Sequence, residues 1–317
     1  MISISLMKYD DIPVGINLWK TQFKNYCYFG AFPNFIDGGQ ALIESYIKEQ
    51  IAKSNAIVAK IDNNIVGFMA WQYFDFHNER TAFLPIVGHA ASVSDEWEIY
   101  QAMYDYASNI WVLDNRFNHL WMTYFDDNTL KNSLYDLGFG SYVIDACQST
   151  SEIRSYIKSE YKITYANRND VEVLYEFAKK INEYYANSPI FLIRKEHTKD
   201  ELIDLICKDH VLIAWDNENV IGVMSFTINQ DFHIEHLTTR DSAYIKSLGA
   251  YINPEYRRKG IGTGLLEKVF TLCREQGKPF VHVSFETSNS NALQFWPKNF
   301  KPIIRSVRRT INKDANK

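Results

Sequence analysis

Apolar residues recur along this chain at two spacings, the helical period near 3.6 residues and the strand period of two. In the first half they predict a strand at Ile2–Leu6, a helix from Asp11 to about Tyr28 and a second helix at Gln40–Lys53. A hairpin follows, because the apolar runs Ala56–Ile61 and Ile65–Trp71 flank an Asp-Asn-Asn turn. The remaining elements of this half are predicted as strand, helix, strand, helix and strand at residues 86–91, 95–113, 120–125, 129–137 and 141–146.

The second half of the chain repeats this order of elements. A strand, two helices and a hairpin are predicted at residues 161–165, 170–185, 199–207, 211–215 and 220–228. A strand before Pro254, a helix, a strand at Phe280–Phe285, a short helix from Asn291 and a strand from Pro302 complete the repeat. The hairpin residues themselves repeat, since Asp62–Met69 matches Asp216–Met224 with one inserted residue. We therefore predict an α/β fold with α+β mixed sheets, built from two tandem units at residues 1–150 and 151–317.

Composition narrows the class of protein. At 317 residues the chain has about twice the usual domain length, and its 46% hydrophobic content suffices for two cores. A net charge of −4 and an isoelectric point near 6.1 argue against a nucleic-acid or membrane-surface partner. The four cysteines are scattered and the histidines lack metal-ligand spacing, so we expect no metal. We find no basic-then-apolar leader and no apolar run of membrane length, and therefore expect a cytoplasmic protein.

One stretch, residues 247–266, carries the clearest chemistry. Its sequence predicts a short strand that ends at a proline. The basic run Arg257-Arg258-Lys259, a glycine-rich turn and an amphipathic helix follow. A glycine-rich turn at a helix N-terminus presents free N–H groups and the positive end of the helix dipole, which together form an anion site. Gly260 and Gly262 lack a Cβ, so a phosphate can approach their backbone closely. The spacing fits neither the nucleotide-triphosphate loop nor the dinucleotide fingerprint.

The spacing Arg257-x-x-Gly260-x-Gly262 resembles the acetyl-CoA pyrophosphate loop of the GNAT family of N-acetyltransferases. The resemblance covers residues 160–311 through the ordered set of strand, proline, basic run, glycines and helix. It covers residues 1–148 through the order of elements and the internal repeat only. It implies two tandem GNAT-like units, each with a splayed central sheet, and acetyl-CoA as co-substrate. It also implies that a substrate amine attacks the thioester directly in a ternary complex.

The same resemblance implies which residues bind acetyl-CoA. Backbone groups of Ala250, Tyr251 and Ile252 would bind the pantetheine arm, and the N–H near Ile252 would polarise the thioester carbonyl. Asn291 would contact the cofactor, although an ordinary N-cap also explains an asparagine there. The pyrophosphate would be held by the loop residues Arg257, Arg258, Lys259, Gly260, Ile261, Gly262 and Thr263.

The first unit is predicted to lack this cofactor site. The segment at the matching position, Ser92–Trp97, contains neither glycine nor arginine. Ser94 is a plausible N-cap, and Asp95 and Glu96 would occupy the positive end of the helix themselves. We therefore expect a degenerate GNAT-like copy in the first half and one acetyl-CoA site per chain.

The catalytic residues are less clear from the sequence. Many family members place a tyrosine, the acid for the leaving thiolate, five residues before the phenylalanine of their Gly-Phe motif, but Phe295 stands there in this chain. The acid therefore stays unassigned: Tyr251 or Tyr256 lies nearby in sequence, or the thiolate leaves unassisted. The candidates for the general base are Glu235, His236 and Glu286.

These features predict an N-acetyltransferase that acts on the primary amine of a small molecule. The acidic residues Asp231, Glu235 and Glu286 favour a cationic amine. Two alternatives stay open: a catalytically silent acetyl-CoA sensor or scaffold, and an acetyltransferase that acts on a protein amine. We expect no nucleic-acid or membrane partner, and a monomer or homodimer.

Overall fold

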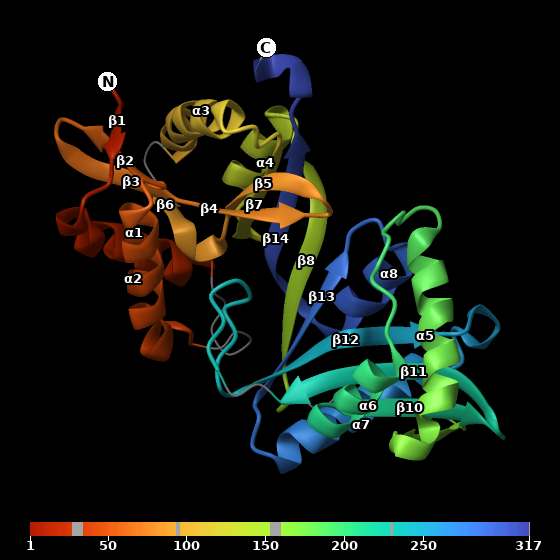
Figure 1. Ribbon diagram of the computed structural model, residues 1–317. Helices are drawn as coiled ribbons and strands as arrows, with labels where there is room; N and C mark the ends of the chain where they lie inside the picture. The colour runs from red at the N-terminus through yellow and green to blue at the C-terminus, as the bar shows by residue number, and fades with distance from the viewer. Residues whose placement is uncertain (27–33, 93–95, 153–159, 229–230, 317) are drawn as a thin grey trace. The chain divides into compact units, whose positions relative to one another are not determined.

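The computed structural model describes residues 1–26, 34–92, 96–152, 160–228 and 231–316 (Figure 1). The first half contains β1 (Ser3–Leu6), α1 (Ile12–Tyr26), α2 (Ile36–Ala52), β2 (Ala56–Ile61), β3 (Asn64–Ala70), β4 (Gln72–Phe76), β5 (Glu79–Leu84), β6 (His89–Ala91), α3 (Glu96–Leu113), β7 (Asn118–Tyr124), α4 (Asn128–Asp136) and β8 (Gly140–Ser149). The second half contains β9 (Lys162–Tyr165), α5 (Val171–Ala186), α6 (Lys199–Lys208), β10 (His210–Asp216), β11 (Asn219–Ile228), β12 (Ser242–Ile252), α7 (Ile261–Glu275), β13 (Phe280–Glu286), α8 (Ser290–Asn299) and β14 (Lys301–Thr310).

This architecture confirms the predicted α/β class, because a mixed sheet and a smaller antiparallel sheet are flanked by helices. The order hairpin, strand, helix, strand, helix and strand occurs in both halves, after a strand and two helices, and the first half adds β4 and β5 before its single strand β6. One hairpin, β4–β5, was missed by the sequence analysis. Only the residues His77 and Asn78 separate its strands, and both adopt positive φ angles of 51° and 63°.

The chain folds into two compact units that do not follow the predicted boundary at residue 150. Unit 1 comprises Met1–Asp145, Phe232–Thr239 and Pro302–Lys317, and unit 2 comprises Ala146–Asp231 and Arg240–Lys301. Strand β8 therefore contributes residues 140–145 to unit 1 and residues 146–149 to unit 2. As the limits of an internal repeat, residues 1–150 and 151–317 stay a prediction.

Unit 1 contains the antiparallel sheet β1-β2-β3-β6 and the strand series β4-β5-β7-β14. Strands β5 and β7 are parallel, and β14 runs antiparallel to β7, from Ile304↔Tyr124 to Thr310↔Asn118. The final strand was predicted to complete the second half of the chain, and this placement is wrong, because β14 packs in unit 1. Its cationic side chains have partners there: Arg305 donates to Ser141 Oγ at 2.7 Å and Arg309 to Tyr104 OH at 3.1 Å.

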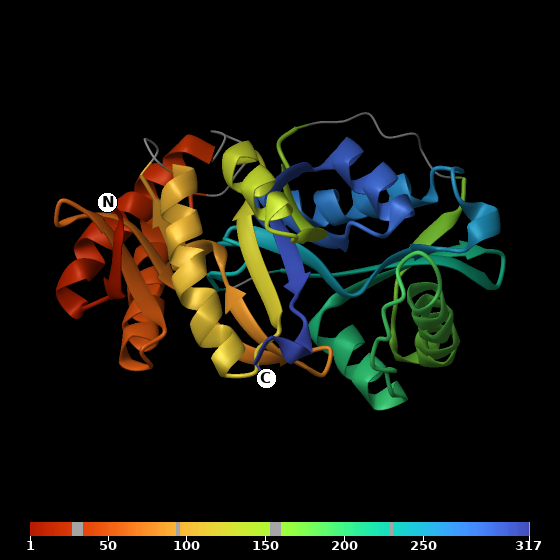
Figure 2. The same ribbon diagram turned by 90° about the horizontal axis from the view of Figure 1, so that it is seen from above.

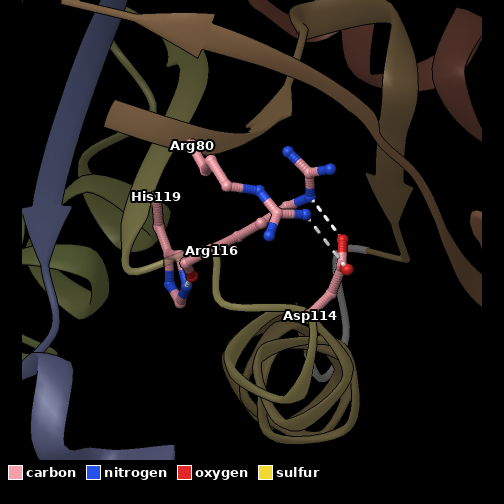
Figure 3. A network of polar contacts seen from close by, with 4 residues as sticks. All are labelled: Arg80, Asp114, Arg116 and His119. Atoms are coloured by element: carbon pink, nitrogen blue, oxygen red, sulfur yellow. Dashed lines mark hydrogen bonds and ion pairs between the residues drawn. The ribbon is translucent and has the colours of Figure 1, made fainter. Parts of the chain in front are cut away.

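A polar network fixes the end of α3 in unit 1 (Figure 3). Asp114, directly after α3, pairs with Arg80 of β5 at 3.2 Å and with Arg116 at 2.7 Å. Nε2 of His119, on β7, lies 3.0 Å from the Arg116 carbonyl oxygen, and because a carbonyl oxygen only accepts, this nitrogen is the donor. Burial lowers the pKa of His119 to about 4, and its neutral ring can accept from Tyr104 OH through Nδ1 at 2.9 Å. Since Arg80 and Asp114 are half-exposed, their ion pair contributes at most about 1 kcal/mol.

Unit 2 holds the strand series β13-β12-β11-β10-β9, with residues 146–149 of β8 beside β13. Figure 2 shows α7 and α8 on one face of this sheet and α5 and α6 on the other. The apolar side predicted for α7 is confirmed by burial of Leu265, Leu266, Val269, Phe270 and Cys273, each at most 3% exposed. On the opposite face, Leu174, Phe177 and Ile181 of α5 pack against the sheet.

Candidate functional site

Strand β12 carries a large bulge at its centre. Met224 of β11 pairs with Ala250, but Phe226, two residues on, pairs with Ile245, so residues 246–249 loop out of the ladder. Ser247 and Gly249 adopt positive φ angles of 66° and 69°. The bulge is anchored because Ser225 Oγ donates to the Lys246 carbonyl oxygen and accepts from the Gly249 N–H at 3.1 Å.

The parallel strands β12 and β13 separate beside this bulge. Among the residues that the structure describes, their pairing runs from Ser242↔Phe280 to Ile245↔Val283 and then stops. Beyond the bulge, Ala250–Ile252 pair with β11 only. The Asn253 N–H donates back to Ile221 on β11 at 2.9 Å, and N–H directions alternate along a strand, so the Ile252 N–H points to the open edge. An open edge can accept an extended ligand by backbone pairing.

The glycine-rich loop follows directly after this edge. Residues Pro254–Tyr256 form a 3₁₀ turn, and Gly260 is the N-cap of α7 with φ 80°, which favours glycine. Among the described residues, the first N–H of α7 that donates to a backbone carbonyl of the preceding turn is that of Gly264, which bonds the Gly260 carbonyl oxygen at 2.9 Å. The amides of Ile261–Thr263 are thus available at the positive end of the helix. With the exposed cations Arg258 and Lys259 beside them, they fit a pyrophosphate.

Gly262 lies against a side chain of α8. A Cβ at this position would lie 3.3 Å from the Phe295 ring on α8. The Phe295 ring therefore lies next to Gly262, and it meets the Trp296 ring edge-on at a centroid distance of 4.8 Å. The Phe295 ring, which has no hydroxyl, therefore contributes to the packing of α8 against α7.

Arg257 points back from the loop toward the sheet. Its Nε donates to the Ile252 carbonyl oxygen at 3.1 Å. Its guanidinium lies 5.1 Å from the ring centroid of Tyr184 and 5.5 Å from that of Tyr251. Arg257 thus stabilises the junction between β12 and the loop, a role that its spacing to Gly260 did not reveal.

Tyr184 at the end of α5 is bonded to the start of α8. Its hydroxyl donates to Asn289 Oδ1 at 2.9 Å and accepts from Asn291 Nδ2 at 2.8 Å. The N-cap of α8 is Asn289, whose side chain accepts from the Ala292 N–H, so the suggestion that Asn291 is the N-cap is wrong. Asn291 is exposed beside the splay, and its cofactor contact stays a prediction.

Glu286, the last residue of β13, lies in a second group of side chains from α5 and the following loop. Burial raises its pKa above the ordinary glutamate value, and Arg194 and Tyr185 partly offset this effect. Burial together with the Glu286 charge raises the pKa of Tyr185 to about 12. Arg194 stacks on the Tyr185 ring at 4.7 Å and donates to the Ser247 carbonyl oxygen of the bulge at 2.9 Å.

A surface pocket of about 460 Å³ opens between α5 and the segment that follows β12. Its lining includes Tyr184 and Tyr251, the carboxylates Glu183 and Glu255, and Lys180. Tyr251 is 9% exposed and packs on Phe177, and burial raises its pKa despite the Arg257 guanidinium. A pocket of this volume suits a small molecule.

The structure does not group all the predicted catalytic residues. Glu286 and Tyr251 belong to unit 2, whereas Glu235 is an exposed residue of the segment Phe232–Thr239 in unit 1. The Tyr256 hydroxyl donates to Asp216 at 2.8 Å. Tyr184, Tyr185, Arg194 and Asn289 were missed, because no local motif marks them.

The matching helix of unit 1 begins with a buried carboxyl group. Ser94 and Asp95, predicted as cap and first turn, lie outside the described residues. Glu96 is the first residue of α3, is 7% exposed and accepts from Gln22 Nε2 at 2.8 Å. Burial and the nearby Asp127 raise the pKa of Glu96 to about 7. A carboxyl group at this helix end disfavours a phosphate.

Glu96→Gln is expected to stabilise unit 1 at alkaline pH only. Because the folded pKa is raised, protonated Glu96 contributes stability at low pH that is lost as the pH rises through about 7. Thermal denaturation of the variant and wild type should therefore agree at pH 5. At pH 8 the variant should melt roughly 2–4 °C higher, as for a difference of about 1 kcal/mol in a unit of this size. The exposed Glu98→Gln serves as the control on the same helix, and an equal shift in both variants would contradict the assignment.

The described residues contain neither a membrane-spanning helix nor a metal-binding group of side chains. None of the helices there is long and apolar enough to cross a membrane. No three histidine, cysteine, aspartate or glutamate side chains in the same ranges lie together as a metal site would require.

In this α/β domain a splayed mixed sheet lies beside a glycine-rich helix N-terminus, and helix N-termini of this kind can bind phosphate groups. Residues 175–300 match the family described as "Acetyltransferase (GNAT) family", and this part of the chain is a domain of that family. The matched range includes the bulge, the open strand edge, the loop, the pocket and Glu286.

Solved structures share the fold over nearly the whole chain. A GCN5-related N-acetyltransferase from Sphaerobacter thermophilus is similar with a TM-score of 0.61 and 12% identity, covering 98% of this chain and 96% of that one. A GCN5-related glucosamine N-acetyltransferase region of a fungal multi-domain GH3 β-N-acetylglucosaminidase is similar with a TM-score of 0.55 and 13% identity, covering 97% of this chain and 38% of that one. At these identities both show the fold alone. No curated protein sequence matches the chain.

Proposed function

We propose that this protein is an acetyl-CoA-dependent N-acetyltransferase that acetylates the primary amine of a small molecule in a ternary complex. The observation that carries the proposal is the continuity of the open edge of β12 with the anion-binding N-terminus of α7. Both features lie within the matched GNAT domain. The degenerate helix start in unit 1 supports one cofactor site per chain.

The residues of unit 2 have distinct roles in this proposal. The amides of Ile261–Thr263, with Arg258 and Lys259, hold the pyrophosphate, and the edge Ala250–Ile252 pairs with the pantetheine arm. Acetyl-CoA supplies the activated acyl thioester. The Ile252 N–H, which points to the open edge, stabilises negative charge on the thioester oxygen as the amine attacks. Glu286 accepts a proton from the amine.

The acceptor is proposed to be a cationic amine. Two carboxylates, Glu183 and Glu255, line the pocket against Lys180, so its lining has a net negative charge. Such a lining attracts an amine that bears a second positive charge and repels one that bears a carboxylate. The pocket volume of about 460 Å³ limits the acceptor to a small molecule or a single protruding side chain.

Release of the CoA thiol from acetyl-CoA over a panel of amines tests this function. We expect diamines and glucosamine to give faster release than amino acids, by at least about tenfold for the dicationic amines, which corresponds to roughly 1.4 kcal/mol. Binding of acetyl-CoA with no release for any amine would favour the silent sensor. Release only with lysine-containing peptides would favour a protein acceptor. Two calorimetric acetyl-CoA sites per chain would contradict the assignment of unit 1.

A further inference from the structure

The side chain at the usual position of the proton donor cannot donate a proton. Phe295 has no hydroxyl, and its ring is packed on Gly262 and Trp296. A departing thiolate near the β12–β13 splay must therefore take its proton from another group or from water. Six tyrosines of unit 2 lie on α5, β12 and the turn that follows β12: Tyr175, Tyr184, Tyr185, Tyr244, Tyr251 and Tyr256. Tyr175 stacks on lysine side chains, and Tyr185 lies against Glu286. Tyr244 lies where β12 and β13 are still paired, and its hydroxyl bonds Ser284 Oγ at 2.6 Å.

Among the residues that the structure describes, the Tyr184 hydroxyl hydrogen-bonds two side chains at the start of α8. The Tyr256 hydroxyl bonds Asp216, beyond the loop. Tyr251 is 9% exposed and its ring packs under α5 on Phe177. The Tyr184 hydroxyl, in contrast, is oriented by two amide side chains, Asn289 and Asn291, at 2.9 and 2.8 Å.

The position of Tyr184 relative to the sheet supports a role at the splay. Helix α5, which carries it, lies on one face of the sheet, and α8 lies on the other (Figure 2). A hydrogen bond between them must pass the end of the sheet, where β13 has ended at Glu286 and is no longer paired with β12. The Tyr184 hydroxyl therefore lies by the gap into which the open edge of β12 faces.

We propose that Tyr184 is the proton donor to the leaving thiolate, and this inference rests on the proposed acetyl transfer. The amine nitrogen bonds to the thioester carbon, the C–S bond breaks, and its electron pair leaves with sulfur. The Tyr184 hydroxyl turns from Asn289 Oδ1 to that sulfur and gives it the O–H proton, which yields the CoA thiol. Glu286 takes the surplus proton of the nitrogen. Transfer of this proton from Glu286 to the Tyr184 phenolate through water restores both groups. Asn291 Nδ2, which donates to the Tyr184 oxygen, stabilises the transient phenolate.

Tyr184→Phe tests the proposal, with Tyr175→Phe on the same helix as the matched control. We expect kcat for the best amine to fall roughly tenfold in the first variant at unchanged acetyl-CoA affinity. This loss is below the usual range for acid catalysis because a thiol already ionises near pH 8.5. The control, whose ring stacks on Lys179 and Lys199, should keep the wild-type rate. Turnover by wild type with no loss in Tyr184→Phe would overturn the role of Tyr184 and leave the acetyltransferase function standing.

Two further measurements separate proton donation from a structural role. Adding Phe295→Tyr to the Tyr184→Phe variant restores a hydroxyl on α8 and should recover at least about threefold in rate; no recovery would overturn the proposal. Independently of turnover, calorimetry compares CoA with desulfo-CoA. The preference of wild type for CoA should shrink about fivefold in Tyr184→Phe, as for loss of one hydrogen bond to sulfur. An unchanged preference would overturn the contact even if no amine is turned over.

Discussion

Gly260→Asp is expected to lower the affinity for acetyl-CoA by on the order of 100-fold or more. The new carboxylate would lie at the N-cap of α7, within the group of amides that is proposed to hold the pyrophosphate. Two like charges about 4 Å apart at an effective dielectric constant near 20 repel by roughly 4 kcal/mol, and about 1.4 kcal/mol corresponds to a factor of ten. The left-handed φ of 80° adds strain of about 1–2 kcal/mol to the folded state for any residue with a Cβ.

Calorimetric titration measures this effect, and the chain provides a matched control. Gly277, just beyond the other end of α7, has φ 64° and open space around its Cβ position. Gly277→Asp therefore introduces the same charge and similar strain far along the helix, and should lower Tm comparably while acetyl-CoA still binds. Lys259→Glu, at an exposed position, reverses a charge of the loop without this strain and should weaken binding most at low salt. Full affinity in both Gly260→Asp and Lys259→Glu would remove the loop from the cofactor site.

The sequence predicted best those elements whose signals are local. The hairpin around Asp216–Asn219 and the buried side of α7 each depend on neighbouring residues, and the structure confirms both. The β4–β5 hairpin was missed because its turn, His77-Asn78, reaches positive φ without a glycine. The position of β14 could not be deduced from its own residues. Its partner β7 ends about 180 residues earlier, and the apolar pattern of β14 would also fit the edge strand of another sheet.

The candidate site shows the same division. The residues of the loop at 257–263 are contiguous, so their types and spacing could be recognised from the sequence. The structure places Gly260 at the start of a helix, as predicted. Tyr184 and Asn289 lie 105 residues apart and meet only through the fold. Arg194 reaches the bulge across 53 residues, and the bulge itself begins where Ser247 takes a positive φ that no sequence rule demands. Glu235 and Glu286 looked equivalent in sequence, but only Glu286 belongs to unit 2.

Glu286→Gln is expected to lower kcat by on the order of 100-fold to 1,000-fold while acetyl-CoA still binds. The amide keeps the shape of the side chain but cannot accept a proton from the attacking amine, and general base catalysis is typically worth about 100-fold to 10,000-fold. Tyr185 and Arg194, which lie against Glu286, do not replace it, because a guanidinium does not accept protons and the pKa of Tyr185 is raised to about 12.

The pH profile of wild type provides an independent check on this base. Glu286 must be ionised to accept a proton, and burial raises its pKa above the ordinary value of 4.5. The rate should therefore fall as the pH drops through this raised pKa, so that the acid limb of kcat/KM lies above that of an exposed carboxylate. Glu286→Gln should lose this limb and keep only the titration of the amine.

Glu176→Gln and Glu235→Gln complete the design. Glu176 of α5 is exposed and pairs with Lys179 at 2.9 Å, so its substitution should leave kcat and the pH profile unchanged. Glu235 is the other carboxylate predicted as a base, and parallel kinetics with one amine discriminate between the two carboxylates. A large loss in Glu235→Gln together with a wild-type rate in Glu286→Gln would transfer the role to Glu235. That outcome would also require the segment Phe232–Thr239 of unit 1 to act in the chemistry of unit 2. The raised pKa and the position of Glu286 at the end of β13, where the strands separate, lead us to expect the opposite result.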